Sequence, residues 1–342
     1  MDKKSFTCFI PGRADALTRD DELWHAPLPE TRSPGTQTAI NSGQSPMTVG
    51  AYLEACRIFL EENRASALQA VLSAVGIPDL SDVHTIQLSL EKHGAFYHPI
   101  RMTVLTGSKP VHAVINGAVS EPGRSLVDHE FEMLSMLGRE QPCLLPRVYG
   151  TGRVKTASGN AAFFTGEWFA HYHEFHVTGR EDHFQTVIWE SDGRHRILPF
   201  EISLPFYREA ARILTRYYDI KTSRQIYPWH HAAGDFIVNP EKMGDPVRLI
   251  TVRSYLPVME ELEAEAGKAE SILPALLIFF LNLTIKNRLD RADGTGEPVF
   301  LDNRVLDQTI SGFLKGLEEN PGVQEHPCLK HDFLTWVKTL NP

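Results

Sequence analysis

The sequence predicts an α+β protein in which strands dominate one part of the chain and helices dominate the part that follows. Three segments between Val83 and Val119 alternate apolar and polar residues with the period of a half-buried strand. Beyond Pro257, apolar residues recur at helical spacing. A polar loop and two short apolar runs lie between these regions, from Trp229 to Tyr255. The chain is long enough for the sheet-rich part and the helical part to have separate cores.

Composition excludes several classes of protein. The 342 residues carry a net charge of −9, which argues against a general nucleic-acid or anionic-membrane surface and leaves local basic patches open. The N-terminus lacks the apolar core of a signal peptide, and the most apolar run, Ile272 to Ile285, is too short to span a bilayer. The cysteines are far apart and form no paired metal motif, so we expect free thiols and a cytoplasmic location. They are Cys8, Cys56, Cys143 and Cys328.

The first 80 residues divide into an arm and a helical segment. Residues 1–46 are rich in Pro, Gly, Thr and Ser without periodicity, which predicts an irregular arm. We expect it to be ordered only where Phe6, Phe9, Ile10 or Trp24 contact the rest of the protein. Residues 47–80 carry apolar positions at helical spacing up to Val75, which predicts one long or two short helices.

Residues 81–168 have the pattern of three strands, a helix and two more strands. Breaks containing Gly or Pro separate the alternating segments, as expected between antiparallel strands. The predicted strands are Thr85–Leu90, Ile100–Leu105, Val111–Val119, Pro146–Gly150 and Ala161–Thr165, and the predicted amphipathic helix is Arg124–Leu137.

Residues 169–342 are predicted to be mostly helical, with a hairpin insertion near 184–199. The strands of that hairpin, Phe184–Trp189 and His195–Pro199, are joined by a turn at Ser191-Asp192-Gly193. Apolar residues at helical spacing predict five helices. They are Leu204–Tyr218, Val258–Ala269, Ile272–Leu289, Val305–Leu317 and Phe333–Leu340.

The segment from Trp229 to Tyr255 is predicted to be a polar loop that leads into a β-hairpin. Phe236–Val238 and Val247–Val252 are apolar and β-branched, and turn-forming residues separate them. A loop that opens into a hairpin is a common way to present catalytic side chains. We therefore expect the functional site here.

The same segment resembles the catalytic segment of the aminoglycoside phosphotransferase and choline kinase branch of the protein-kinase-like fold. That branch reads His-Gly-Asp, four residues, Asn, an apolar strand, a turn, a second strand, then Ile-Asp. When its strand is set on Phe236–Val238, His230 falls on the catalytic Asp. Asp235 then falls on the metal-binding Asn, and Thr251 on the Asp that holds magnesium. A register with Asp235 as the catalytic Asp places the Asn on Pro240, after the strand has begun, and is rejected.

Four earlier segments resemble the small lobe of the same family, in the same order. HAVING ends an apolar strand with Asn116 in place of the lysine, and HEFEMLSML resembles the following helix, with Glu130 near its start. LPRVYGTG resembles the next strand entry. FFTGEWF resembles the hinge strand, which implies that Glu167 and Phe169 lie beside an adenine ring. The resemblance implies a bilobal fold with an antiparallel small lobe plus one helix and a mostly helical large lobe, binding ATP with Mg²⁺.

The substituted residues indicate a degraded phosphotransfer site. Asn116 carries no charge, and Thr251 offers one neutral oxygen where Mg²⁺ prefers a carboxylate. Each loss of a preorganised electrostatic group costs on the order of 10²–10³ in rate. Gly94 is the sole glycine between the first two predicted strands, so a close phosphate cradle is not expected. Without its lysine, Glu130 is expected to be a solvated helix residue. The leading hypothesis is a pseudokinase-type binding or regulatory protein.

Two other functions remain open. In the first, the protein is an active phosphotransferase that acts on a small alcohol or amino sugar, with His230 as the base and Asp235 as a catalytic and metal-binding residue. In the second, the arm and the helices before the small lobe form a scaffold that binds a protein partner. A nucleotide or small molecule is the expected ligand, and nucleic acid and membranes are not expected; the oligomeric state is open.

Non-catalytic roles are the alternatives for the same side chains. His230 and His231 are then loop histidines bonded to backbone groups, and Asp235 caps the loop. The histidines of HYHEFH, at 171, 173 and 176, are not expected to bind metal, because no regular secondary structure places all three on one face with a carboxylate.

Overall fold

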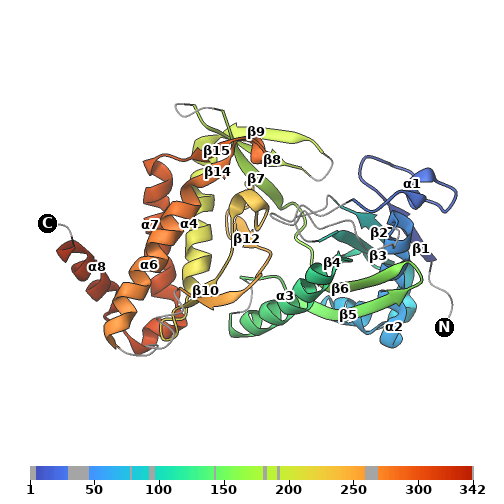
Figure 1. The fold of residues 1–342 in the computed structure, drawn as a ribbon, viewed down its shortest axis with the longest axis horizontal. Helices are drawn as coiled ribbons and strands as arrows, with labels where there is room; N and C mark the ends of the chain where they lie inside the picture. The colour runs from blue at the N-terminus through green and yellow to red at the C-terminus, as the bar shows by residue number, and fades with distance from the viewer. Residues whose placement is uncertain are drawn as a thin grey trace. The chain divides into compact units, whose positions relative to one another are not determined.

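The chain forms two compact units in the computed structural model (Figure 1). Unit 1 consists of Met1–Met136 and Pro146–Phe169, and unit 2 of Leu137–Leu145 and Ala170–Pro342. The structure describes residues 5–29, 46–77, 79–91, 97–141, 144–179, 183–190, 193–258 and 269–340. The sheet-rich first unit and the helix-rich second unit confirm the predicted α+β class.

Unit 1 is built on a six-stranded sheet with the order β1-β2-β3-β4-β6-β5. All neighbours are antiparallel except β1 and β2, which are parallel. The alternation of apolar residues predicted the three central strands correctly, and the helix α3 and strands β5 and β6 follow in the predicted order. The strands are β1 (Ser5–Phe9), β2 (Val83–Leu90), β3 (Ile100–Thr106), β4 (Val111–Ala118), β5 (Val148–Thr156) and β6 (Gly159–Glu167).

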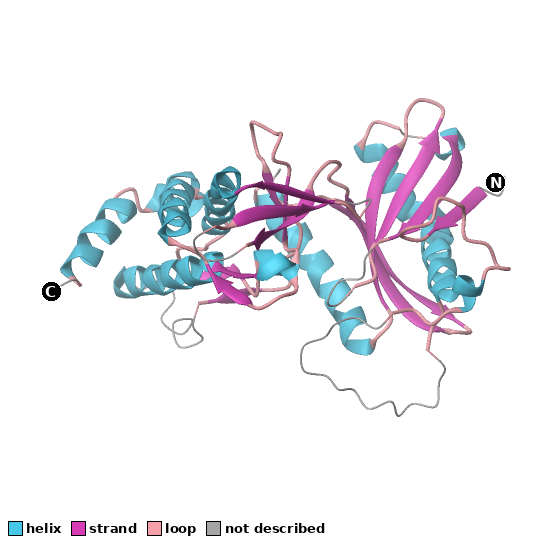
Figure 2. Ribbon diagram, turned by 90° about the horizontal axis from the view of Figure 1, so that it is seen from above, coloured by secondary structure: helices cyan, strands magenta, loops and turns pink. Residues whose placement is uncertain are grey.

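Helices pack on both faces of this sheet, because consecutive residues of a strand point to opposite faces. Phe163 stacks on Phe59 of α2 (Val49–Ala74), with ring centroids 5.5 Å apart. Its neighbour Phe164 contacts Phe131 of α3 (Glu121–Glu140) at 6.3 Å. Helix α2 is a single long helix, and Figure 2 shows cyan helices packed against magenta strands. A Cβ at Gly117 would lie 2.2 Å from the Tyr52 hydroxyl, so glycine permits this close packing.

The N-terminal arm is not irregular throughout, contrary to the prediction. Ser5–Phe9 form strand β1, paired in register with β2, and Glu22–His25 form the short helix α1. The reason is burial: Phe6, Ile10 and Trp24 pack against the core, as expected, and β1 satisfies the edge hydrogen bonds of β2. A five-residue strand at an edge is too short to show a period. Residues 30–45 of the arm, like Gly94, lie outside the described part of the chain.

Unit 2 contains a five-stranded antiparallel sheet with the order β12-β11-β7-β8-β9. The predicted hairpin is present as β8 and β9, although residues 191–192 of its turn are outside the described residues. Strand β7 was not predicted, and β12 is shorter than expected. The strands are β7 (His173–Thr178), β8 (Gln185–Trp189), β9 (His195–Pro199), β11 (Phe236–Val238) and β12 (Val247–Leu249), and β10 (Arg224–Ile226) pairs separately with β13 (Tyr255–Pro257).

The described residues of unit 2 also form four α-helices: α4 (Phe200–Arg216), α6 (Ala269–Arg288), α7 (Asn303–Glu319) and α8 (Leu329–Thr339). Phe279 and Phe280 of α6 contact Phe313 of α7. The ring centroid of Phe313 lies 5.5 Å from that of Phe333 in α8. The helix predicted over Val258–Ala269 falls almost entirely outside the described residues. In the described part of the chain, no helix is both long and apolar enough to cross a bilayer.

The sequence predicted only helices after Pro257, but the structure also contains strands there. Strands β14 (Leu289–Arg291) and β15 (Pro298–Phe300) form a two-stranded ribbon between α6 and α7. The apolar spacing of α6 runs through Leu289, so the helical period masked the start of β14.

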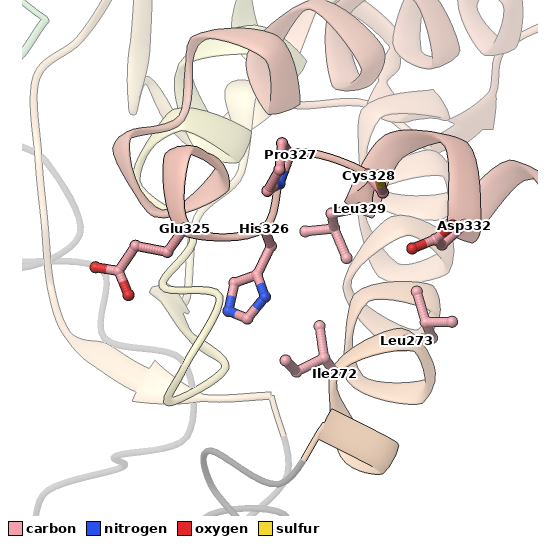
Figure 3. Close-up of a pocket in the computed structure, with 8 residues that line it drawn as sticks. All are labelled: Ile272, Leu273, Glu325, His326, Pro327, Cys328, Leu329 and Asp332. Carbon is pink, nitrogen blue, oxygen red and sulfur yellow. The ribbon is translucent and has the colours of Figure 1, made fainter.

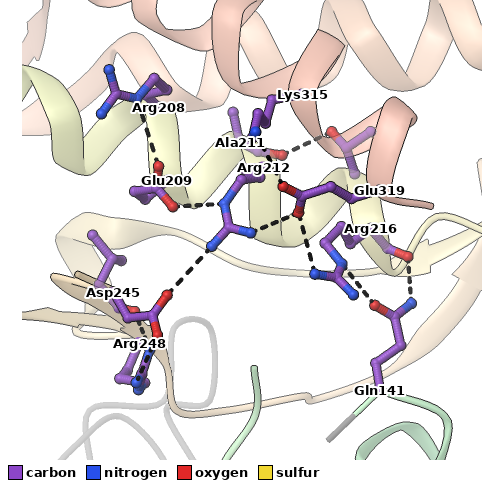
Figure 4. Close-up of polar contacts among 12 residues, drawn as sticks. Gln141, Arg208, Glu209, Ala211, Arg212, Arg216, Asp245, Arg248, Lys315 and Glu319 are labelled. Atoms are coloured by element: carbon purple, nitrogen blue, oxygen red, sulfur yellow. Dashed lines mark hydrogen bonds and ion pairs between the residues drawn. The ribbon is translucent and has the colours of Figure 1, made fainter. Parts of the chain in front are cut away.

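An ion-pair network joins α4 to α7 (Figure 4). The Arg212 guanidinium donates to Glu209 at 2.6 Å and to Glu319 at 2.7 Å. Arg216 also reaches Glu319, at 3.2 Å, and accepts a hydrogen bond at its backbone oxygen from Gln141. Because the Arg212 side chain is only 13% exposed, this network is shielded from solvent and stabilises the helix pair more than surface pairs do.

Candidate functional site

The loop from Trp229 to Asp235 is a tight structure fixed by its own side chains. His230 caps a single 3₁₀ turn, His231–Ala233, because its Nδ1 accepts a hydrogen bond from the Ala232 amide at 3.1 Å. Gly234 ends the turn with φ of 74°, a conformation that favours glycine. The Asp235 carboxylate accepts from the His230 amide at 2.8 Å, so the structure brings His230 and Asp235 together.

Asp235 is buried and held by an arginine. Arg253 donates from Nη1 to Oδ2 at 2.7 Å and from Nη2 to Oδ1, a bidentate arrangement. Only 1% of Asp235 is exposed. Burial raises the pKa of Asp235, and the Arg253 guanidinium opposes that shift. Both carboxylate oxygens therefore accept hydrogen bonds from a cation of the same unit.

His230 is neutral at physiological pH. Burial, together with the neighbouring His231, lowers its pKa to about 4. Since Nδ1 accepts the Ala232 amide proton, the neutral ring carries its own proton on Nε2. His230 can therefore donate a hydrogen bond from Nε2, whereas its basic nitrogen is already engaged by the loop.

His231 of this loop belongs to a group of ionisable side chains, buried except for the partly exposed Glu174, which we call the histidine–aspartate cluster: Glu174, His176, His231 and Asp290. His176 Nε2 lies 2.9 Å from Glu174 Oε1, and its Nδ1 lies 3.7 Å from Asp290 Oδ1. His231 Nε2 lies 3.6 Å from Asp290 Oδ2. Burial raises the pKa of Asp290, but His231 and His176 outweigh it and hold the pKa well below its usual range. The cluster links β7, the loop and β14.

Asp290 is the residue of this site that sequence reasoning missed. It lies in the middle of β14 and accepts hydrogen bonds from the amides of Val177, at 3.0 Å, and Arg291, at 2.7 Å. A signal was present: Leu289-Asp290-Arg291 alternates, and Asp293-Gly294-Thr295-Gly296 is a turn sequence typical of hairpins. The helical spacing before it took precedence in the prediction.

Comparisons with known proteins give structural similarities but no sequence match. No protein-family model matches the sequence, and no curated protein matches it. Among solved structures, 108 chains are similar to this one. One is the Neurospora crassa PAN3 pseudokinase mutant, with 10% sequence identity and a TM-score of 0.30. The match covers 74% of this chain and 60% of the PAN3 chain, so it spans less than two thirds of that protein.

The other predicted site residues lie as follows. Thr251 follows β12 in unit 2 and is half-buried, two residues before Arg253. In unit 1, Asn116 is half-buried in β4 and pairs with Phe164 of β6. Glu167 ends β6 and accepts a hydrogen bond from the Arg147 amide at 3.2 Å. Phe169 is the last residue of unit 1 and is half-buried. Their roles in binding a cofactor stay predictions.

Glu130 is not the solvated helix residue that we expected. It is 1% exposed, and its carboxyl group accepts a hydrogen bond from the Tyr97 hydroxyl. The prediction considered only a lysine partner in β4. A tyrosine supplied from the chain segment before β3 satisfies the carboxyl group instead, at a sequence separation that no helical pattern reveals.

Within the described residues, no group of three or more His, Cys, Asp or Glu side chains is arranged to hold a metal ion. In the HYHEFH segment, His173 and His176 lie in β7 at positions of opposite parity, so they point to opposite faces of the sheet. His171 precedes the strand with φ of 66°. The segment supplies one histidine to the histidine–aspartate cluster.

Among the described residues of unit 2, side chains away from this loop line surface pockets, two of which follow. One, of about 330 Å³, is lined by Ile272 and Leu273 of α6 and by the segment from Glu325 to Leu329 (Figure 3). The other, of about 310 Å³, lies between α4 and the turn that joins β11 to β12. Neither is lined by a residue of the histidine–aspartate cluster.

The cluster makes stability depend on pH. Burial lowers the pKa of His176, but Asp290 and Glu174 outweigh it and raise the pKa to about 9. Because this value exceeds the unfolded value of 6.5, the stabilisation is fully present below pH 6.5 and is lost as the pH rises through 9. We expect the unfolding free energy of unit 2, measured by urea denaturation, to fall by roughly 3 kcal/mol between pH 6 and pH 9.5.

The variant His176→Gln provides the control for this prediction. It removes the titrating group while keeping a polar side chain of similar length, so its stability should vary little over the same range. A wild-type protein that is equally stable at pH 6 and pH 9.5 would contradict the assignment of a protonated His176.

Proposed function

We propose that this chain is a kinase-like protein with a degraded phosphotransfer site, which acts by binding as a pseudokinase-type regulatory protein. The observation that carries the proposal is the bidentate pair between Arg253 and Asp235. At the position where the resemblance implies a metal ligand, both carboxylate oxygens are occupied by a guanidinium. A magnesium ion at Asp235 would have to displace a buried cation and its hydrogen bonds.

The residues present do not fit Mg²⁺. A hard cation prefers several oxygen ligands, usually including a carboxylate that is free to bind it. At the second metal position, Thr251 supplies a single neutral oxygen. The described residues offer no third acidic or histidine ligand arranged with Asp235. We therefore derive no step that passes through a metal ion.

His230 does not fit the role of a general base. An effective base has a pKa near the working pH and a free lone pair that faces the substrate. The pKa of His230 is lowered to about 4, and its unprotonated nitrogen accepts the Ala232 amide. These two observations favour binding over transfer.

A nucleotide assay tests the proposal. The full chain is incubated with radiolabelled ATP and a panel of small alcohols and amino sugars, in Mg²⁺ and in Mn²⁺. We expect the wild-type chain to form no more phosphorylated product than the variant His230→Ala, which sets the background. The variant His195→Ala, which changes a histidine stacked on Trp189 outside the loop, is the matched control. Turnover that His230→Ala abolishes and His195→Ala preserves would overturn the proposal.

A further inference from the structure

The ribbon formed by β14 and β15 has two faces with different environments. Asp290 points from one face into the histidine–aspartate cluster. Because side chains alternate along a strand, Leu289 and Arg291 point to the other face. Leu289 pairs with Phe300, so both lie on this outer face. Leu289 is 38% exposed and Phe300 is 52% exposed.

The outer face continues an apolar row on α6. Leu281 and Ile285 precede Leu289 at intervals of four residues, which places them on one side of the helix. They are 48% and 55% exposed. Leu281, Ile285, Leu289 and Phe300 thus form what we call the apolar stripe. In Figure 1, β14 follows directly from the end of α6. Scattered exposed apolar residues are ordinary, whereas a continuous row of them marks an interaction site.

Three cations border the apolar stripe in the sequence: Lys286 follows Ile285, Arg288 precedes Leu289, and Arg291 lies two residues after Leu289. The Arg288 guanidinium lies 4.3 Å from the centroid of the Phe300 ring, and the Lys286 ammonium lies 4.7 Å from that of Tyr227. Arg291 is exposed on the outer face of the ribbon. Arg288 donates to the Leu301 carbonyl at 2.7 Å and Arg291 to the Gly296 carbonyl at 3.0 Å, but none of the three cations forms an ion pair with a carboxylate of the described residues. In a chain of net charge −9, cations without a carboxylate partner beside an apolar row indicate a negatively charged partner.

We propose that the apolar stripe binds an acidic amphipathic helix of a partner protein. From Leu281 to Leu289 the stripe is about 12 Å long, which matches two turns of a helix with apolar residues at every third or fourth position. Acidic side chains on the flanks of that helix would pair with Lys286, Arg288 and Arg291. The inference does not depend on the state of the phosphotransfer site, because the four residues of the stripe lie outside the loop; of the cations, Lys286 alone lies near it, 5.9 Å from the centroid of the Trp229 ring.

Two other occupants fit less well. A second copy related by two-fold symmetry would place the same three cations against themselves, and like charges at an interface repel. An anionic membrane would attract the cations but repel the rest of a chain with charge −9. An acidic amphipathic helix of a different protein can cover the apolar stripe and pair its carboxylates with the three cations.

Fluorescence anisotropy with the full chain tests the proposal. The probes are labelled helical peptides with leucine at positions i, i+4, i+7 and i+11 and glutamate on both flanks, and the same peptides with lysine in place of glutamate. We expect the acidic peptides to bind at least tenfold more tightly than the basic ones, with an affinity that falls as salt increases. Ile285→Ser should weaken binding about tenfold, as expected for a central apolar contact.

Ile197→Ser is the matched control, because Ile197 in β9 is 56% exposed, as Ile285 is 55% exposed, but lies outside the stripe. Equal binding of acidic and basic peptides, or equal binding by Ile285→Ser and wild type, would overturn the proposal. So would either rival occupant: dimerisation in sedimentation that Ile285→Ser removes, or binding to phosphatidylserine vesicles that it removes. The ATP assay is a separate readout, so the two proposals can fail independently.

Discussion

Asp290→Asn is expected to lower the unfolding free energy of unit 2 by about 3–5 kcal/mol at pH 7. The side chain of Asp290 has no exposed area, and it compensates the charge of His176. Asparagine keeps the size of the side chain but removes the charge, so protonated His176 loses one of its two carboxylate partners. In the native protein the two Asp290 oxygens accept hydrogen bonds from the backbone amides of Val177 and Arg291. The asparagine NH₂ group is a donor and would face one of these donors.

Urea denaturation followed by tryptophan fluorescence, to which Trp189 contributes, measures this effect. Trp189 is a suitable probe because its ring centroid lies 4.6 Å from that of His176. Asp293→Asn is the matched control: Asp293 is exposed in the turn between β14 and β15, with φ of 54°, which asparagine tolerates. The control should change stability by less than about 0.5 kcal/mol. Equal effects of the two substitutions would show that the cluster contributes no special stability.

The second large effect is expected from Arg253→Met. Methionine retains much of the apolar side chain but leaves the Asp235 carboxylate buried without its cation. Removing one partner of a buried pair costs about 3–5 kcal/mol. The cost should fall when the remaining charge is removed too, so we expect Arg253→Met combined with Asp235→Asn to be more stable than Arg253→Met alone. Urea denaturation of the wild type, both single variants and the double variant gives the coupling energy.

Arg194→Met is the control for the arginine pair. Arg194 is 77% exposed and lies 3.4 Å from Glu190, so it forms an arginine–carboxylate pair of the surface kind. Its loss should cost less than about 1 kcal/mol. If Arg253→Met is no more destabilising than Arg194→Met, Asp235 is not an ion-paired carboxylate. Its oxygens would then be available to a metal ion.

The sequence was sufficient to predict the elements that carry a strong local period. Burial of one face produces the alternation in β2, β3 and β4 and the helical spacing in α2, α4 and α7. This pattern is local in the sequence and can be read directly from it. The loop and hairpin that contain His230, Asp235 and β11 were also recognised, because turn-forming residues separate two apolar runs. Short strands without a full period were missed: β1, β7, β10, β13, β14 and β15.

Only the tertiary structure revealed how the polar side chains are paired. Arg253 lies 18 residues after Asp235, Tyr97 lies 33 residues before Glu130, and Asp290 lies 114 residues after His176. A buried carboxylate needs a partner, but nothing in a local pattern tells which distant residue supplies it. The sequence determined where apolar surface is buried and which segment forms the loop. The fold decided that His230 is neutral and that the Asp235 oxygens are bonded to Arg253, because burial and neighbouring charges exist only once the chain has folded.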